Sequence, residues 1–248
     1  MTAGRGHARF LASVTSESEA SLAALLGADI IDCKDPLAGA LGALPRAVVR
    51  SIRAGLPRHI PVSATIGDMP GEPVRVAGAV RAMAATGVDF VKVGVFPEGD
   101  ASGTVAKLGE LRLEGPRLVG VLFADRQPSF GLIGLMGRAG FAGVMLDTAG
   151  KSGGTLLDHL PPGMLSAFIG VAREAGLFAG LAGALRLDQV PDLLRLGPDI
   201  LGFRGALCRG ARRESGIDAS AILAVRRAIP RARTRHGAGR RETRDRIT

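Results

Sequence analysis

The side chains with the most chemical promise in this chain are its lysines, because there are so few of them. Only four of the 32 basic residues are lysine, and the others are arginine. Arginine stays protonated near neutral pH, whereas a lysine amine can lose its proton and then attack a carbonyl carbon or accept a proton. A lysine is therefore a stronger candidate for amine chemistry here than in a lysine-rich protein. The four are Lys34, Lys92, Lys107 and Lys151.

Three of these lysines lie at or near short apolar runs that are typical of buried strands. Lys34 directly follows one run, Lys92 lies inside another, and Lys151 comes a few residues after a third. Lys107 lies in a helix-like segment, and we expect it to be solvated. Acidic residues gather at the ends of the same kind of run, at Asp32, Asp35, Asp125 and Asp147.

Eight such runs recur along the chain, each followed by a turn and a helix-like segment. Their starts are roughly 20 to 35 residues apart, which is the length of one strand–helix repeat. Helical periodicity is clearest in the segments 17–26, 45–54, 74–85 and 165–175. The eight runs are 10–14, 30–33, 61–66, 90–95, 118–124, 143–146, 177–181 and 200–203.

Eight repeats in 248 residues predict one closed (β/α)8 barrel, a fold of roughly 250 residues. The alternative is a doubly wound open sheet, which more often has five to seven strands. We expect the barrel to occupy residues 1–230 as a single catalytic domain. Residues 231–248 contain seven arginines and two acidic residues, a composition that predicts a disordered basic tail.

The C-terminal ends of barrel strands carry the active sites of this fold. Because Lys34, Lys92 and Lys151 fall at that end, we expect an amine to attack a carbonyl and form an iminium, which acidifies the neighbouring carbon. Lys92 is then a candidate base, and Asp125, Asp147 or Lys151 could move protons. The structural alternative is that these lysines and aspartates form ion pairs that plug the barrel.

A phosphate site is predicted in the last two loops, where small residues allow backbone N–H groups to approach a ligand. Gly183 and Gly205 supply these small residues, and Arg204 adds a cation that can bind phosphate with two hydrogen bonds. Ser63 and Asp125, at the ends of two other strands, are further candidate substrate contacts. No nucleotide motif is present, and the histidines lie away from the strand ends, so we expect neither a metal nor an organic cofactor.

The net charge of +9 does not by itself indicate a nucleic-acid-binding protein, because much of it lies in the tail. A solvated tail is the simpler interpretation, and a weak contact with nucleic acid or an acidic partner is the alternative. There is no membrane-spanning run and no secretory signal, and Cys33 and Cys208 lack metal-site spacing, so we expect a cytoplasmic protein with reduced thiols. Homo-oligomerisation is left open.

Between Phe10 and Ile229 the chain resembles the (5-formylfuran-3-yl)methyl phosphate synthase family of methanofuran biosynthesis, whose fold is a (β/α)8 barrel. The segments that carry this resemblance occur in the same order and at matching spacing. They are Gly27-Ala-Asp-Ile-Ile-Asp-Cys-Lys-Asp-Pro36, Ser63-Ala-Thr-Ile-Gly-Asp68, Val91-Lys-Val-Gly94, Met145-Leu-Asp-Thr148 with Lys151, and Gly202-Phe-Arg-Gly-Ala-Leu-Cys208.

The resemblance implies that two glyceraldehyde 3-phosphate molecules condense and cyclise to a furan aldehyde phosphate, with loss of phosphate and water. It also implies that Lys34 forms the Schiff base, that Lys92 accepts a proton, and that Asp147 and Lys151 assist condensation and elimination. The enzyme would be a carbon–oxygen lyase acting on phosphates, without a cofactor.

The chain departs from archaeal members of that family at Cys33 and Asp35, where they have a valine and an asparagine, and at Phe123, where they have a tyrosine near the end of the fifth strand. The arginine-rich composition suggests a bacterial methylotroph that uses a methanofuran-like one-carbon carrier. Two alternatives remain: another Schiff-base aldolase-type barrel acting on a phosphosugar, and a non-catalytic phosphosugar-binding barrel that regulates a partner.

Overall fold

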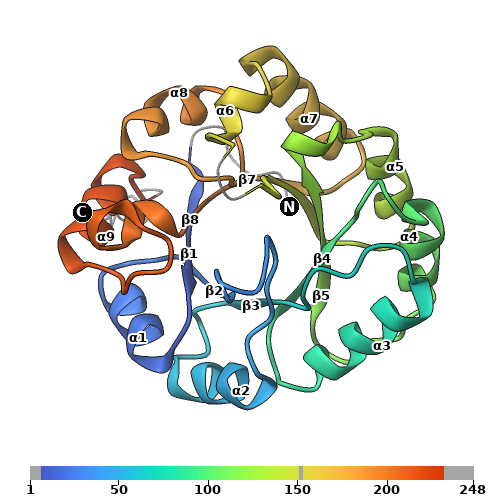
Figure 1. Ribbon diagram of the computed structural model, residues 1–248, viewed down its shortest axis with the longest axis horizontal. Helices are drawn as coiled ribbons and strands as arrows, with labels where there is room; N and C mark the ends of the chain where they lie inside the picture. The colour runs from blue at the N-terminus through green and yellow to red at the C-terminus, as the bar shows by residue number, and fades with distance from the viewer. Residues whose placement is uncertain (1–6, 151–152, 232–248) are drawn as a thin grey trace, which may run out of the picture.

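The protein is a closed barrel of eight parallel strands, each of which pairs with the next while β8 pairs with β1 (Figure 1). The computed structural model describes residues 7–150 and 153–231. Closure of the ring confirms the predicted barrel and rules out the open sheet. The strands are β1 (Arg9–Val14), β2 (Ile30–Cys33), β3 (Val62–Thr65), β4 (Phe90–Gly94), β5 (Arg117–Phe123), β6 (Gly143–Asp147), β7 (Phe178–Leu181) and β8 (Ile200–Phe203).

Helices surround this barrel as an outer ring (Figure 1). Among the described residues, four short 3-10 helices lie in the loops that follow β5, β7 and β8: η1 (Ala124–Arg126), η2 (Leu187–Gln189), η3 (Gly205–Leu207) and η4 (Arg209–Ala211). The α-helices are α1 (Glu17–Leu25), α2 (Arg46–Gly55), α3 (Pro73–Ala84), α4 (Ala101–Gly109), α5 (Gly131–Arg138), α6 (Leu156–His159), α7 (Pro162–Glu174), α8 (Val190–Arg195) and α9 (Ala219–Ala228).

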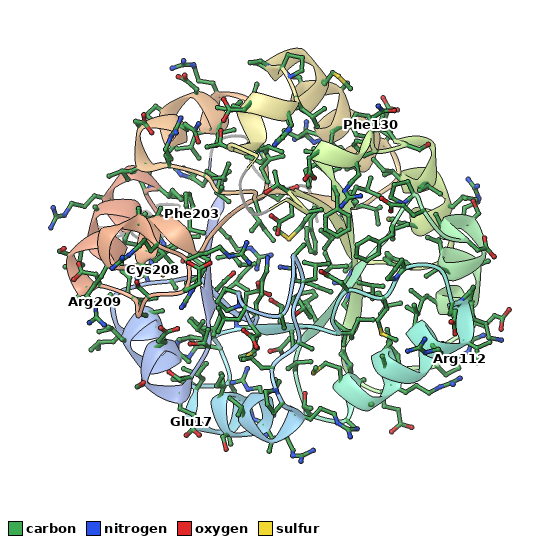
Figure 2. All side chains as sticks on the ribbon, viewed as in Figure 1. Glu17, Arg112, Phe130, Phe203, Cys208 and Arg209 are labelled. Atoms are coloured by element: carbon green, nitrogen blue, oxygen red, sulfur yellow. The ribbon has the colours of Figure 1, made fainter. Side chains whose placement is uncertain are left out.

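The strands are almost wholly buried because both faces of the sheet are covered. One face meets the helices, and the other fills the barrel interior with side chains, as Figure 2 shows. In that view the labelled Phe203 lies inside the ring of helices, whereas Arg209 and Glu17 lie at its outer edge. The interior includes a compact apolar group of Leu11, Ile30, Val119, Val121, Met145 and Ile200.

Local signals account for most element boundaries. Ser16 caps α1 by accepting a hydrogen bond from the Glu19 N–H, and Asp218 caps α9 in the same way. Gly176 follows the C-cap residue of α7 with a positive φ, the conformation that commonly ends a helix. The third strand is shorter than predicted and starts at Val62, after a proline that has no N–H to donate.

The C-terminal tail that was predicted for 231–248 lies outside the described residues, apart from Arg231. That residue contacts the barrel, with its side chain near the Asp29 carboxylate and the Gly27 carbonyl. In the described part of the chain, no helix combines the length and the apolar character needed to cross a membrane.

Candidate active site

An inner ion pair lies within the barrel. The Lys92 amine donates to Asp32 Oδ2 at 2.9 Å, and the two side chains are only 4% and 0% exposed. Asp32 also accepts hydrogen bonds from Ser13 Oγ at 3.0 Å and Ser63 Oγ at 2.6 Å. The charge of this buried carboxylate is thus satisfied from three strands.

The strand register explains this cluster. Ser13 on β1 pairs with Asp32 on β2, which in turn pairs with Ser63 on β3, so the three side chains lie at one level of the barrel. Lys92 reaches the same carboxylate from β4. Burial alone would raise the pKa of Asp32, but Lys92, Lys34 and the Ser63 hydroxyl outweigh it and lower that pKa below its usual value. Asp32 is therefore ionised at neutral pH.

An outer ion pair joins opposite sides of the barrel mouth. Lys34 directly follows β2, Asp147 ends β6, and the Lys34 amine donates to Asp147 Oδ2 at 3.0 Å. The other Asp147 oxygen accepts the Thr148 N–H at 2.8 Å, which fixes the orientation of the carboxylate. Unlike the inner pair, this one has side chains that are 12% and 11% exposed.

Both ion pairs border a cavity of about 720 Å³, large enough for a small organic ligand. Lys34, Lys92 and Asp147 all contribute to its wall. The rest of the lining comes mainly from loops after β6, β7 and β8, together with Leu11 and Ser13 of β1. The cavity is therefore displaced toward one side of the mouth.

The loop between β2 and α2 fills the other side of the mouth and turns inward over the barrel (Figure 1). Asp68, after β3, holds it by accepting the N–H groups of Ala40 and Leu41 at 2.8 Å each. Leu41 is fully buried in the apolar group that includes Phe123, and Phe96 packs on Phe123 with ring centroids 4.6 Å apart. Because apolar side chains occupy this sector, the polar chemistry is confined to the cavity.

The loops after β7 and β8 line the cavity, and several of their residues there are small. Gly183 has φ of +103°, and a Cβ built there would lie 2.9 Å from Thr148 Cγ2, so only glycine fits. The next residue, Ala184, keeps φ of +47°, a conformation that is uncommon for residues with a side chain and that clusters at ligand sites. Gly205 opens η3 on the neighbouring loop.

Arg204 donates its hydrogen bonds to protein acceptors rather than to a ligand in the cavity. Its guanidinium donates twice to the Glu19 carboxylate, with the shorter contact at 2.6 Å, and the remaining donors go to backbone carbonyls. Burial acts to raise the pKa of Glu19, but the hydrogen bonds from Arg204 and Thr15 outweigh it and lower that pKa. The carbonyls are those of Ser13, Arg213 and Ser215.

Since an arginine has five N–H donors, none of those on Arg204 is left for a ligand. The predicted direct phosphate contact of Arg204 is therefore not what this geometry offers. The residue instead ties α1 to the loop after β8, where it holds the carbonyls of Arg213 and Ser215.

Two other predicted substrate contacts also have different places in the structure. Ser63 lies beneath Lys92, outside the lining of the large cavity, with its hydroxyl bonded to Asp32. Asp125 accepts the N–H groups of Ala149 and Gly150 at 2.8 and 2.6 Å, and so shapes the loop after β6. Lys151 belongs to the same loop but lies outside the described residues, so its predicted role stays a prediction.

Sequence reasoning did not single out Ser13, which the structure brings to the site through a hydrogen bond to Asp32. Asp32 was noted at a strand end, but its pairing with Lys92 was not predicted, and the spacing of two between Asp32 and Lys34 was a usable signal, because such residues share one face of a strand. Glu19 and Arg213 carried no comparable signal, since their places depend on how distant loops pack. Within the described residues, no group of three or more His, Cys, Asp or Glu side chains could hold a metal ion.

Comparison with known proteins identifies a family that matches nearly the whole barrel. Residues 10–226 match the model of the family described as 4-HFC-P synthase. The chain is 44% identical over 228 residues to a Methylorubrum extorquens protein that carries the name (5-formylfuran-3-yl)methyl phosphate synthase provisionally, and the match covers 90% of this chain and 94% of that one. The enzyme of that name from Methanopyrus kandleri is 37% identical, with coverage of 89% and 98%.

Solved structures show the same fold at lower identity. Phosphoribosyl anthranilate isomerase from Thermus thermophilus superposes with a TM-score of 0.62 at 17% identity, and the match covers 88% of this chain and 96% of that one. That likeness supports the barrel alone, whereas the family match spans nearly the whole barrel and includes both lysine–aspartate pairs. The chain belongs to the (5-formylfuran-3-yl)methyl phosphate synthase family.

Proposed function

We propose that this enzyme condenses two molecules of glyceraldehyde 3-phosphate into (5-formylfuran-3-yl)methyl phosphate, with loss of phosphate and water, through a Schiff base on Lys34. The observation that carries the proposal is the outer ion pair, which places a lysine amine and a carboxylate 3.0 Å apart at the wall of a cavity of about 720 Å³. Iminium formation needs at least an amine and a proton acceptor this close together.

The first step follows from the contact between these two groups. Asp147 Oδ2 takes a proton from the Lys34 amine, which then adds to the carbonyl carbon of the first triose phosphate. Loss of the carbonyl oxygen as water leaves a carbon–nitrogen double bond to Lys34. Because the iminium withdraws electrons, the neighbouring carbon releases a proton and the resulting enamine attacks the carbonyl carbon of the second triose.

Lys92 is the group placed to exchange protons with substrate below Lys34. It reaches the cavity wall while its amine donates to Asp32, whose carboxylate is fixed in turn by Ser13 and Ser63. A buried amine fixed by an ionised partner presents its proton in one direction, toward the ligand. In the same scheme Lys151 assists elimination of phosphate from the condensed product.

The loops after β7 and β8 supply the anion site. The described residues provide no backbone acceptor for the N–H groups of Gly183 and Gly205, and both residues line the cavity. Backbone N–H groups at such loops bind phosphate in many barrels of this fold. The product then serves the synthesis of a methanofuran-type one-carbon carrier, and the activity is that of a carbon–oxygen lyase acting on phosphates.

The proposal is tested by incubating the purified protein with glyceraldehyde 3-phosphate alone. We expect a furan chromophore to appear together with an equal amount of inorganic phosphate. Release of an open-chain aldol without phosphate would show a different aldolase-type reaction. Binding of the triose phosphate with no turnover would instead support a non-catalytic, regulatory barrel.

A further inference from the structure

The loop after β8 carries a second arginine whose bonding contrasts with that of Arg204. Arg213 donates from Nη2 to the Gly39 carbonyl at 3.1 Å, and its guanidinium makes no other hydrogen bond to the described residues. Its Nε is enclosed by protein yet has no acceptor there. Arg213 also lines the large cavity, and no described carboxylate lies within 4.0 Å of its guanidinium.

A half-buried cation with an enclosed, unused donor calls for an explanation. Buried polar groups are almost always hydrogen-bonded, because an unpaired donor loses its interaction with water and gains nothing in return. The single bond to Gly39 fixes the position of the guanidinium but leaves Nε and Nη1 without protein acceptors in the described chain. An anionic ligand in the cavity would accept a hydrogen bond from Nη1, whereas the enclosed Nε lies out of its reach.

The place of this guanidinium differs from that of the backbone phosphate site. Gly183 and Gly205 follow β7 and β8, whereas Gly39 belongs to the loop that begins with Lys34 after β2. In the barrel, β1 separates β8 from β2, so the contact with Gly39 draws the guanidinium toward the β2 side of the cavity. One anion site thus lies on the β7–β8 side of the cavity and the other on the side of the β2–α2 loop.

We propose that Arg213 binds the phosphate of the second triose, while the backbone site holds that of the first. This inference rests on the proposed function, in which two phosphorylated molecules must occupy one cavity together. Arginine suits the task because its planar fork donates two parallel hydrogen bonds to phosphate. Glu214, which also lines the cavity, would keep phosphate away from the neighbouring wall by charge repulsion.

Binding of inorganic phosphate tests the site without any turnover. We expect calorimetric titration to give two phosphate sites per chain in the wild type and one in Arg213→Met. The matched control is Arg212→Met, which removes the same charge from an exposed neighbour that also lines the cavity and should leave both sites. Thermal melting of all three proteins checks that each is folded.

Turnover gives the second arm of the test. In Arg213→Met the glyceraldehyde 3-phosphate concentration for half-maximal rate should rise on the order of 10- to 100-fold, as expected for loss of charge-assisted hydrogen bonds. Borohydride trapping of the first triose on Lys34 should be unchanged. A loss of trapping equal to the loss of turnover would show that Arg213 only shapes the site and would overturn the proposal.

The two proposals fail in different ways. If the wild type forms no furan and traps no triose, the proposed function is wrong, while the phosphate titration still reports on Arg213. If Arg213→Met keeps both phosphate sites at wild-type affinity, the second site is wrong whatever the wild type catalyses. Equal losses in the Arg212 and Arg213 variants would indicate a diffuse effect of charge and would also overturn the assignment.

Discussion

The two lysine–aspartate pairs have nearly the same geometry but very different surroundings. Their nitrogen–oxygen distances are 2.9 Å for Lys92 with Asp32 and 3.0 Å for Lys34 with Asp147. The inner pair is almost fully buried and further fixed by two serine hydroxyls, whereas the outer pair keeps about a tenth of each side chain exposed. The difference separates an amine held in place at the cavity wall from an amine that can leave its carboxylate and bond with a substrate.

This contrast follows from where each lysine lies on its strand. Lys92 lies within β4 with its neighbours packed in the core, so its amine can move little without leaving a buried carboxylate unpaired. Lys34 comes one residue after β2 ends, and its partner Asp147 closes β6 on the far side of the mouth. A covalent intermediate needs that freedom, because the amine must leave its carboxylate to bond with carbon.

The strongest test of this difference between the two pairs is Lys34→Arg, which keeps the charge but removes the nucleophile. We expect turnover to fall at least about 10⁴-fold, since arginine does not deprotonate near neutral pH. The matched control is Lys107→Arg, an exposed lysine that pairs with Glu110 and should keep wild-type activity. Product formation is followed by furan absorbance, and substantial activity in Lys34→Arg would refute the amine mechanism.

Asp147→Asn is expected to have the next largest effect on activity. The amide keeps the size of the side chain and an acceptor for Thr148, but it cannot take a proton from Lys34. We expect kcat to fall about 10²- to 10⁴-fold, the range for losing a general base or acid. Because about a tenth of each side chain stays exposed, the free energy of unfolding should fall by less than when a fully buried pair is broken. A large loss of stability with normal kcat would reverse the two roles.

Asp32→Asn should show the opposite pattern, with its main effect on the free energy of unfolding. Removal of this carboxylate leaves the Lys92 amine buried without a counter-charge, which typically costs about 3–5 kcal/mol. Denaturant unfolding of the two asparagine variants side by side measures the difference. Equal stability losses at Asp32 and Asp147 would show that the inner pair is not distinguished by its burial.

Acid pH should loosen the loop after β6. Burial acts to raise the pKa of Asp125, but the N–H groups of Ala149 and Gly150 lower it below its ordinary value of 3.8. The carboxylate therefore stabilises the fold fully above that ordinary value, and the contribution is lost as pH falls through the lower folded pKa. Hydrogen exchange at Ala149 and Gly150 should rise about tenfold in Asp125→Asn at neutral pH, and unchanged exchange would contradict this role.

Much of the fold follows from the chain alone. The eight apolar runs coincide with the eight strands, because a strand buried on both faces must be apolar nearly throughout. The clustering of Lys34, Lys92 and Asp147 was predictable for a related reason, since parallel strands bring all their C-terminal ends to one side of a barrel.

The partner of each side chain was not predictable. Which aspartate meets which lysine depends on strand register and on side-chain reach across the barrel, and neither is written in the spacing. Arg204 and Arg213 illustrate the same limit, because residues of one type, nine apart in one loop, differ only in the distant acceptors that the fold brings to them. The bonding of Arg204 to Glu19 depends on a helix 185 positions away in sequence.

The central claim is that Lys34 forms a covalent bond with substrate, and reductive trapping tests it most directly. The protein is treated with glyceraldehyde 3-phosphate and borohydride, and the modified residue is located by mass spectrometry of peptides. We predict a stable triose phosphate adduct on Lys34 and none on Lys92, which the inner pair keeps in place. An adduct confined to Lys92, or no adduct on either lysine while furan product accumulates, would contradict the account.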